Sequence, residues 1–290
     1  MELEGCDALR EAARGCGLVL LTATMTEAKP LLAGLEGVET HTVATKELFV
    51  GRTAGAVRAI VGVSGCDKAN AAHLLTCLLQ AMKPRPLLVL QVGVAGALLH
   101  GGRGAGAEVG DIVLATEEIY SDTGSSSPAG WLSVDDLGLP LARVTGGESG
   151  GRFVLDARLI RAARAAIEDI SWPEPRPKVV TGPCVTSSRV TGLSAEGEEV
   201  VGRWRAVAES MEGAAAAHTC ALYGVPFLEI RGISNLVVDR DRASWEVDRA
   251  VRVAVQAALA VSAAFERLPL AADRMAAPDS GSSPLNQEAG

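Results

Sequence analysis

Short apolar runs alternate with amphipathic segments along most of the chain, and glycine, proline or polar residues separate them. A continuous apolar run is typical of a strand buried on both faces, whereas apolar residues at helical spacing indicate a helix that covers a core. This alternation predicts an α/β fold with a mainly parallel, twisted sheet covered by helices on both faces. The predicted strands are residues 18–23, 57–63, 87–92, 111–119, 178–185 and 225–233. The predicted helices are residues 2–15, 27–35, 64–82 with a glycine turn at its start, 156–170, an alanine-rich helix after Glu212, and 245–268.

The remaining segments divide the chain into parts. Residues 1–17 are expected to form an N-terminal extension helix, residues 18–268 the folded domain, and residues 269–290 a disordered tail, because the tail is small, polar and rich in turn formers. Within the domain, residues 93–99 predict a small-residue turn whose glycines let backbone amides approach a ligand. A mobile loop is expected at the glycine-rich residues 101–106 and a long irregular segment, of the kind that can form a lid, at residues 120–140.

Polar residues stand at the ends of three predicted elements. Glu27 follows the first strand, with Thr26 as the expected N-cap of the next helix. Glu212 precedes the alanine-rich helix, and Asn235 follows the strand at 225–233. Ligands of open α/β sheets bind beyond the carboxyl ends of the strands, so these positions suggest a site. Local structure also explains each residue, because a carboxylate complements a helix N-terminus and asparagine favours turns. Taken singly, none identifies a reaction.

Composition narrows the class of ligand. The chain has 290 residues, of which 48% are hydrophobic and 3% aromatic, and its formal net charge is -8. One large α/β domain is the simplest organisation for this length. An acidic surface repels phosphate backbones and anionic lipids, which argues against nucleic-acid and membrane-surface partners. A small-molecule ligand is favoured.

Cysteine and histidine usage argues against disulfides and metals. The six cysteines contain no CxxC pair and several lie in apolar segments, which predicts reduced thiols in a cytoplasmic protein. The four histidines show no metal-ligand spacing, so no metal site is expected. No apolar run reaches the roughly 20 residues that span a bilayer, and a signal-peptide pattern is not evident. The cysteines are Cys6, Cys16, Cys66, Cys77, Cys184 and Cys220; the histidines are His41, His73, His100 and His218.

Glycine turns beside a parallel sheet raise the possibility of dinucleotide binding, which the motifs exclude. The turn after the first strand, TATMTEAKP, contains no glycine, and the later VGVAGAL supplies only Gly93 and Gly96 of a GxGxxG pattern. A GxxxxGK[ST] loop does not occur in the sequence. Dehydrogenase and P-loop functions are therefore disfavoured.

Six segments are similar, in this order, to signatures of the nucleoside phosphorylase and nucleosidase superfamily. They are ATMTEAKPLL, VSGCDKANAAHLL, LQVGVAGAL, VGDIVLA, SMEGAAAAH and RGISNLVVDRD, and the resemblance covers residues 18–268. Within the superfamily, EIRGISNLVVDRDRASWEVDRA together with SMEGAA looks most like the futalosine hydrolases, which remove hypoxanthine from futalosine in menaquinone biosynthesis. The resemblance implies a three-layer phosphorylase/hydrolase-like fold, with a central mixed, mainly parallel sheet flanked by helices, and no cofactor.

The resemblance also implies roles for the carboxylates. Glu27 matches the acidic residue that takes a proton from the attacking water. Glu212 matches the carboxylate that accepts hydrogen bonds from the ribose 2' and 3' hydroxyls, with Met211 beside it in the sugar pocket. Cleavage of an N-ribosidic bond passes through a transition state that resembles a ribosyl cation, so a nearby negative charge stabilises it.

Asn235 stands where the superfamily places its purine-contacting acid or amide. An amide can donate to O6 or accept from a protonated N7, which suits a 6-oxopurine such as hypoxanthine. Ser234 would orient it, and Val185 and Thr186 match the expected walls of the base site, although Val185 replaces an aromatic residue of related nucleosidases. The remaining substrate contacts implied are Ser64, Gly65, Val94, Ala95 and Gly96.

Water is the expected nucleophile. Phosphorylases of this type bind phosphate with arginines, but this chain has Gln91 in LQVGVAG and no arginine in TATMTEAKP. Without those cations a phosphate dianion would be poorly compensated. The alternatives are a nucleosidase for methylthioadenosine, S-adenosylhomocysteine or aminodeoxyfutalosine, which Asn235 disfavours, a purine nucleoside phosphorylase, and a non-catalytic nucleoside-binding protein.

Two questions stay open in the sequence. Ion pairing and helix capping explain the charged and aromatic residues around the last strand, but one of the arginines could instead hold the carboxylate of futalosine. These residues are Arg231, Asp239, Arg240, Asp241 and Trp245. The family resemblance and the alanine-rich helices also suggest a homodimer or a higher homo-oligomer.

Overall fold

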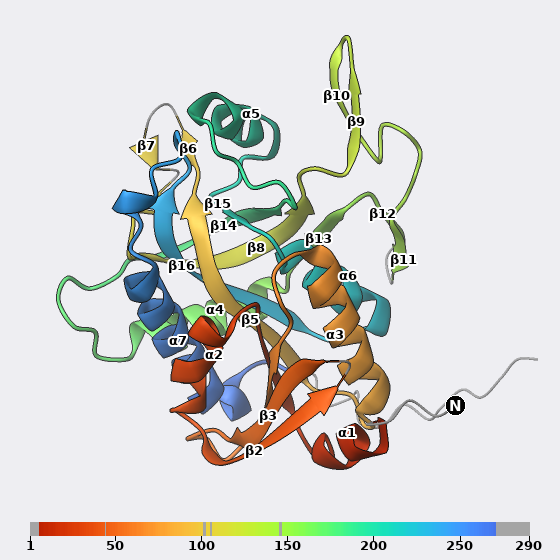
Figure 1. Cartoon of the computed structure of the whole chain (residues 1–290), viewed down its shortest axis with the longest axis vertical. Helices are drawn as coiled ribbons and strands as arrows, with labels where there is room; N and C mark the ends of the chain where they lie inside the picture. The colour runs from red at the N-terminus through yellow and green to blue at the C-terminus, as the bar shows by residue number, and fades with distance from the viewer. Residues whose placement is uncertain (1–5, 44, 101–102, 105, 145–146, 271–290) are drawn as a thin grey trace, which may run out of the picture.

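A twisted mixed sheet forms the middle layer of the molecule (Figure 1). The computed structural model describes residues 6–43, 45–100, 103–104, 106–144 and 147–270. Within them the strand order is β13-β8-β14-β15-β5-β1-β4-β3-β2, and β16 pairs with both β5 and β8. The strands are β1 (Leu18–Thr22), β2 (Glu36–Val43), β3 (Lys46–Arg52), β4 (Arg58–Val63), β5 (Leu88–Ala97), β8 (Ile112–Tyr120), β13 (Arg152–Val154), β14 (Val179–Thr186), β15 (Ala208–Ser210) and β16 (Phe227–Leu236).

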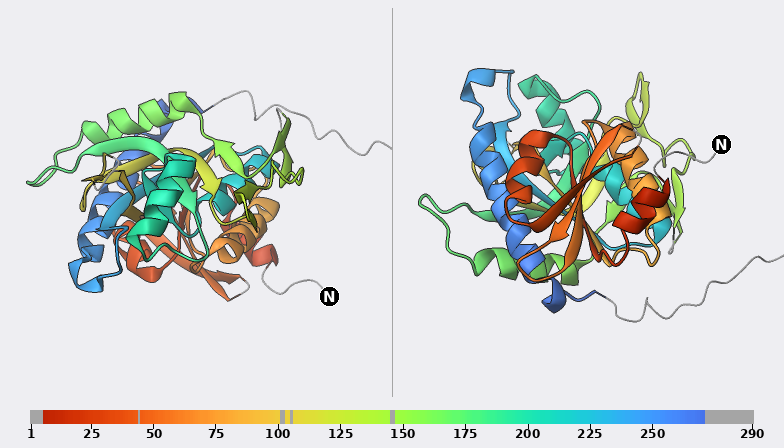
Figure 2. Two further views of the ribbon diagram at one scale, coloured as in Figure 1. Left: turned by 90° about the horizontal axis from the view of Figure 1, so that it is seen from above. Right: turned by 60° about the horizontal axis from the view of Figure 1, so that its bottom comes forward.

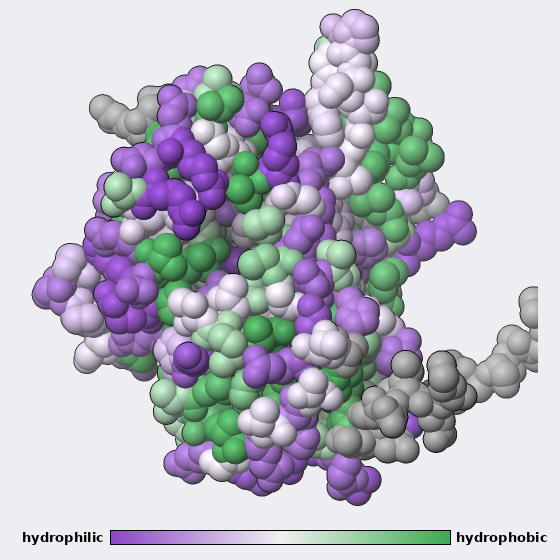
Figure 3. All heavy atoms as spheres, in the orientation of Figure 1, coloured by the Kyte–Doolittle hydropathy of each residue, from purple (hydrophilic) through white to green (hydrophobic). Residues whose placement is uncertain are grey.

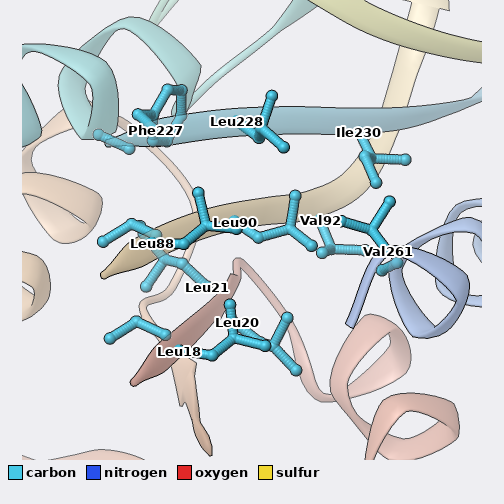
Figure 4. Packing of buried hydrophobic residues seen from close by; sticks show 14 of the residues in the cluster. Leu18, Leu20, Leu21, Leu88, Leu90, Val92, Phe227, Leu228, Ile230 and Val261 are labelled. Carbon is cyan, nitrogen blue, oxygen red and sulfur yellow. The ribbon is translucent and has the colours of Figure 1, made fainter. Parts of the chain in front are cut away.

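The centre of the sheet is parallel and fully buried. β1 pairs in parallel with β4 and β5, and β5 pairs in parallel with β16. Their register aligns Leu20, Leu90 and Leu228 across three neighbouring strands, and none of the three is exposed. Figure 4 shows these leucines packing in one cluster with Val261 of the last helix. Burial of each such side chain contributes about 1.5–3 kcal/mol, which fixes the strands whose carboxyl ends carry the polar residues.

Helices cover both faces of the sheet (Figure 2). On one face lie α1 (Cys6–Ala12), α3 (Lys68–Ala81) and α6 (Gly213–Tyr223), and on the other α2 (Met25–Leu32), α4 (Ala157–Glu168) and α7 (Val247–Ala263). α5 (Ser194–Trp204) packs near the short strand β6 (Leu99–His100), which pairs with β7 (Arg103–Gly104). Two 3-10 helices, η1 (Arg242–Ser244) and η2 (Phe265–Arg267), flank α7. Among the described residues, no helix combines the length and apolar character that crossing a bilayer requires.

Several elements differ from the sequence-based predictions. Residues 93–99 were expected to form a turn, but β5 continues to Ala97, because β16 supplies a parallel partner along this whole length. Thr26 does not cap α2; Thr24 is the N-cap, and its side chain accepts a hydrogen bond from the Glu27 N–H. The irregular segment at 120–140 contains an antiparallel hairpin of β9 (Gly124–Ser127) and β10 (Gly130–Ser133).

Other elements were not predicted at all. β2 and β3 form an antiparallel edge, and β2 is largely exposed, so it lacks the apolar run that marks a buried strand. α5 and the small pair β11 (Ala142–Val144) and β12 (Gly147–Ser149) were also missed. The N-terminal extension is described only from α1 onward, the expected mobile loop at 101–106 only in part, and the tail at 271–290 lies outside the described residues.

Candidate active site

A pocket of about 370 Å³ opens where the carboxyl ends of β1, β15 and β16 meet the middle of β5. Carboxylates, an amide, small residues of β5 and apolar residues of α7 share its wall. Figure 3 shows strongly hydrophilic residues at the upper left of this face, over α5, and others at its left and right edges, with hydrophobic residues between them. The lining residues are Ala23, Thr24, Thr26, Glu27, Cys66, Val94, Ala95, Gly96, Val190, Thr191, Glu209, Ser210, Met211, Glu212, Arg231, Ser234, Asn235, Val237, Arg240, Trp245, Val247 and Val251.

Glu27 combines a structural and a site-facing role. It is the third residue of α2, where its Oε2 accepts hydrogen bonds from the backbone N–H groups of Ala23 and Thr24 at 3.1 and 2.9 Å. Together with the Thr24 side chain this completes a capping box. Its other oxygen, Oε1, accepts a hydrogen bond from the Val94 N–H at 3.1 Å. The cap therefore fixes the carboxylate while Oε1 faces the pocket.

Glu212 occupies the N-cap position of α6, but its side chain makes no capping hydrogen bond. Instead Oε1 accepts from the Asp67 N–H at 3.1 Å, and Oε2 pairs with Arg231 Nη2 at 3.2 Å. Burial raises the pKa of the Glu212 carboxyl group, and the Arg231 charge partly opposes this shift. The sequence alone also allowed Glu212 to act only as a helix cap, but its oxygens contact Asp67 and Arg231 and accept no hydrogen bond from the first turn of α6.

Arg231 is a buried cation at the centre of the site. Only 1% of it is exposed, and its Nη1 donates to the Val94 carbonyl oxygen at 3.2 Å. Burial alone would lower the pKa of Arg231, but the carboxylates of Glu229 and Glu212 reverse the effect and raise it, so the guanidinium is charged. β16 places Arg231 directly opposite Gly93 of β5.

Gly93 makes room for two of these side chains. A Cβ atom at this position would lie 2.6 Å from Arg231 Nη1 and 2.7 Å from Glu27 Oε1. The guanidinium and the Glu27 carboxylate therefore meet over the bare backbone of a strand. The glycine was expected to bring a backbone amide close to a ligand, but in the structure it accommodates the protein's own charged groups.

Asn235 and Ser234 lie at the same pocket, beside a register shift between β16 and β5. Ser234 Oγ is 2.8 Å from Asn235 Oδ1 and 3.2 Å from the Ala95 carbonyl oxygen. Asn235 Nδ2 donates to the Leu236 carbonyl oxygen at 3.0 Å. The serine and the adjacent backbone thus orient the carboxamide, and one N–H of the Asn235 amide group stays available to a ligand.

The structure brings together most, but not all, of the residues expected from the sequence. Val94, Ala95, Gly96 and Met211 line the pocket with the three polar residues discussed above. Ser64 and Gly65 do not line it, although the next residue, Cys66, does. Ser64 is fully buried, and its hydroxyl donates to the Thr22 carbonyl oxygen at 3.1 Å.

The two expected base walls lie elsewhere. Val185 is fully buried in a small apolar cluster, and the fully buried Thr186 donates to Glu118 and accepts from the Ala214 N–H. Their places at the pocket are taken by Val190 and Thr191, farther along the same loop. Thr191 is fixed by two hydrogen bonds of 2.8 Å to the Glu209 carboxylate. Val190 and Thr191 follow the end of β14, and this position after a predicted strand is the feature of the sequence that could have identified them.

The C-terminal charged residues divide into two groups. Asp239 accepts from the Ser194 N–H, and Asp241 caps η1 by accepting from the Ala243 N–H, so both have structural contacts. Arg240 and Trp245 line the pocket, and the Arg240 guanidinium lies 4.9 Å from the centre of the Trp245 ring. The rim of the pocket therefore carries a stacked, exposed cation.

Comparison with known proteins identifies the family. Residues 18–268 match the Phosphorylase superfamily. This chain belongs to the Phosphorylase superfamily. Two members of known name are the futalosine hydrolases of Streptomyces coelicolor and Acidothermus cellulolyticus. The first is 36% identical over 173 residues, which are 59% of this chain and 63% of that protein, so the chain spans less than two thirds of it. The second is 29% identical over 248 residues, which are 85% of this chain and 91% of that protein.

Solved structures of the superfamily share the fold. The chain resembles the 5'-methylthioadenosine/S-adenosylhomocysteine nucleosidase of Neisseria meningitidis in complex with methylthio-immucillin-A, with a TM-score of 0.71 and 23% identity over 87% of this chain and 99% of that one. It also resembles the S-adenosylhomocysteine nucleosidase of Streptococcus pyogenes in complex with 5-methylthiotubericidin, with a TM-score of 0.70 and 20% identity over 87% and 97% of the two chains. The three-layer α/β fold with a mixed sheet, expected from the sequence, is confirmed.

Proposed function

We propose that this phosphorylase-superfamily protein is a nucleosidase that uses water to cleave the N-ribosidic bond of futalosine, releasing hypoxanthine. The observation that carries the proposal is the convergence of Glu27 and Glu212 on Arg231 in a pocket that Asn235 also lines. These residues lie far apart in the sequence, and a single nucleoside can contact all of them. The names of the two curated relatives support futalosine as the substrate.

The arrangement suits hydrolysis at a ribose. We assign to Glu27 Oε1 the role of accepting a proton from a water molecule, which the Arg231 guanidinium would help to hold over Gly93. Glu212, with Met211 beside it, would accept hydrogen bonds from the ribose 2' and 3' hydroxyls. Its negative charge stabilises the positive charge that develops on the sugar as the bond to the base lengthens.

The leaving base would lie against Asn235, Val190 and Thr191. The oriented carboxamide can donate an N–H to O6 of a 6-oxopurine. A hydrogen bond there stabilises the departing hypoxanthine and discriminates against a 6-amino group, which is itself a donor. This argues against the adenine nucleosides that are the substrates named for the structural neighbours.

The charges of the pocket favour water over phosphate. Among the described residues, Arg231 and Arg240 are the cations that line the pocket. Arg231 is already paired with Glu212 and Glu229, so it cannot neutralise a dianion as well. Gln91, at the position of a phosphorylase arginine, is fully buried and does not line the pocket.

The proposal also covers the contact with the substrate's carboxylate, the cellular location and the oligomeric state. Arg240, stacked on Trp245 at the rim, is the arginine best placed for the carboxylate of futalosine. We place the enzyme in the cytoplasm, where the thiols of Cys16, Cys66, Cys184 and Cys220, which form no disulfide, would stay reduced. A homo-oligomer is supported by exposed apolar side chains such as Val154 and Leu222, at 81% and 56%.

One assay tests the proposal. Purified protein is incubated with futalosine, inosine or methylthioadenosine, with and without phosphate, and free hypoxanthine and adenine are measured. We expect hypoxanthine from futalosine at a rate that phosphate does not change. Adenine release would instead indicate a nucleosidase for 6-amino substrates, a phosphate requirement would indicate a phosphorylase, and binding without release would indicate a non-catalytic module. Light scattering on the same preparation gives the oligomeric state.

A further inference from the structure

Arg231 forms a second ion pair, with a carboxylate that does not line the pocket. Glu229 lies two residues earlier on β16, so both side chains project from the same face of the strand. Glu229 Oε1 forms an ion pair with Arg231 Nε, and Glu229 is fully buried and outside the pocket lining. The guanidinium therefore sits between Glu229 on the inner side and Glu212 on the pocket side.

A second buried carboxyl group, Glu118 of β8, supports Glu229. The two carboxyl groups reach the same space beside the start of α6, and neither is exposed. Gly213 at the start of α6 leaves the space for them: a Cβ there would lie 2.2 Å from Glu229 Oε2 and 2.4 Å from Glu118 Oε2. No N–H or O–H group among the described residues donates to Glu118 Oε1 or Glu229 Oε2.

A proton on Glu118 would let its carboxyl group donate to the neighbouring Glu229 and so remove an unpaired buried charge. Burial, and next the neighbouring Glu229 carboxylate, raise the pKa of Glu118 well above its ordinary value, while Arg231 and the Thr186 hydroxyl oppose the shift. Two adjacent buried carboxylates would repel each other strongly, whereas a carboxylic acid can donate to a carboxylate. Glu118 therefore carries the proton and Glu229 the negative charge.

The protonation of Glu118 determines the net charge of the buried groups around the proposed sugar site. With Glu118 neutral, Glu229 cancels the charge of Arg231, and the charges of Glu212 and Glu27 remain uncompensated. We propose that Glu229, fixed by protonated Glu118, is a positioning residue that neutralises Arg231 and so preserves the negative charge of Glu212 for the ribosyl cation. The proposal rests on the proposed nucleosidase function. It also gives a reason for the exclusion of phosphate, because the uncompensated charges of Glu212 and Glu27 make the site negative and repel an anion.

The first test is Glu229→Gln, which keeps the size of the side chain and removes its charge. Arg231 would then pair fully with Glu212 and shift it, so kcat for nucleoside hydrolysis is expected to fall about a hundredfold, the effect of displacing a catalytic group by about 1 Å. KM should change much less than kcat, because substrate binding is spread over the whole pocket.

The matched control is Glu117→Gln, which removes the charge of the carboxylate next to Glu118 on β8. Glu117 pairs with the partly exposed Arg152 at 2.7 Å and does not line the pocket, so its loss should leave kcat unchanged. Circular dichroism of each variant shows whether it folds. A native kcat in folded Glu229→Gln would overturn the proposal.

Variants of Glu118 give a second, independent test. Glu118→Leu removes the donor to Glu229 and should lower kcat in the same way as Glu229→Gln. Glu118→Gln retains an N–H that can donate to Glu229, so it should restore most of the lost turnover. Equal kcat values in the two variants would overturn the role of Glu118, even if Glu229→Gln failed to fold.

These outcomes are separate from those of the proposed function. The native enzyme is assayed first with each nucleoside, and the variants are then measured with whichever nucleoside it hydrolyses. Adenine release by the native enzyme would refute futalosine as the substrate and leave the Glu229 test intact. A normal Glu229→Gln enzyme that still releases hypoxanthine would refute the positioning role alone.

Discussion

The backbone N–H of Asp67 donates a hydrogen bond to Glu212 Oε1 across 3.1 Å, which joins the start of α3 to the start of α6. Asp67 holds φ +83° and ψ 156°, a conformation that residues with a side chain adopt only when their surroundings impose it. Its Oδ1 accepts hydrogen bonds from the Ser188 hydroxyl at 2.6 Å and the Lys68 N–H at 2.7 Å. These contacts hold the backbone N–H of Asp67 in the orientation that donates to the Glu212 carboxylate.

Asp67→Gly tests whether the strained backbone serves the site. Glycine tolerates this conformation, so relief of strain of order 1–3 kcal/mol should offset the few tenths lost at the helix cap, and thermal stability should not fall. Turnover should drop about tenfold, because the amide is no longer held by Ser188. Ser188→Ala, which removes the same contact and keeps the strain, should lower both stability and turnover. An unchanged kcat in both variants would show that this hydrogen bond is incidental.

Removal of either carboxylate charge should abolish most activity while the fold persists. For Glu27→Gln we expect kcat to fall about 10²–10⁴-fold, because the amide can keep the oxygen that caps α2 but cannot take a proton from water. Glu212→Gln should lose a comparable factor, since the charge opposite the ribosyl cation disappears. Steady-state kinetics and circular dichroism measure both effects. The exposed Glu36→Gln serves as the control, and near-native turnover in either site variant would remove that residue from the mechanism.

The carboxylates could be predicted because Glu27 follows a strand that the apolar pattern reveals and Glu212 precedes the alanine-rich helix. The first strand is parallel to β5 and β15 is antiparallel to it, so the meeting of Glu27 and Glu212 follows from the pairing of the strands in the sheet and not from the apolar pattern alone. Arg231 could not be assigned in the same way. Its role depends on contacts with Glu212, Gly93 and Glu27, which come from three other segments of the chain. No local sequence pattern predicts these contacts.

The errors have equally specific causes. The family resemblance placed Val185 and Thr186 at the base site, but the chain after β14 reaches the pocket only at Val190 and Thr191. The small residues after Gly93 look like a turn in isolation and form a strand because β16 pairs with them. Pairing with a strand that is distant in the sequence therefore decided the structure of the segment after Gly93.

The amide at position 235 should determine which purine is released. Asn235→Asp removes the N–H donor to O6 and offers a carboxyl group that, when protonated, can donate to N7 of an adenine nucleoside. We expect kcat/KM for futalosine to fall about tenfold or more, and the preference for methylthioadenosine relative to futalosine to rise. Competition between the two nucleosides, followed by chromatography of the bases, measures the ratio. Val237→Ala changes the same wall of the pocket without altering its polarity, so a similar shift in that control would argue against the amide.

Arg240 should affect the substrate's tail and not its chemistry. Arg240→Gln removes the cation at the rim, so KM for futalosine should rise about two- to fivefold, the size expected for an exposed ion pair, at constant kcat. Inosine lacks a carboxylate, and its kinetics should not change. Arg242→Gln is the matched control, because Arg242 also approaches Trp245, at 5.9 Å, but does not line the pocket. If the two substitutions raised KM equally, the contribution of Arg240 to binding would come from the general surface charge and not from contact with the carboxylate.

The buried Glu118 should make stability depend on pH in a direction opposite to that of most carboxylates. Its folded-state pKa is raised above the value of about 4.3 expected in the unfolded chain, so folding takes up a proton between the two values. The stability from this group is fully present below the unfolded pKa and is lost as pH rises through the folded pKa, with a slope of about 1.4 kcal/mol per pH unit for one proton. Glu118→Gln cannot titrate and should lack that slope, so its stability relative to the native protein should improve as pH rises above 4.3. Denaturant unfolding of the two proteins from pH 4 to pH 8 measures the difference, with Glu117→Gln as the control. Parallel curves would mean that Glu118 is ionised in the folded protein, and a second buried negative charge would then have to be balanced around Arg231.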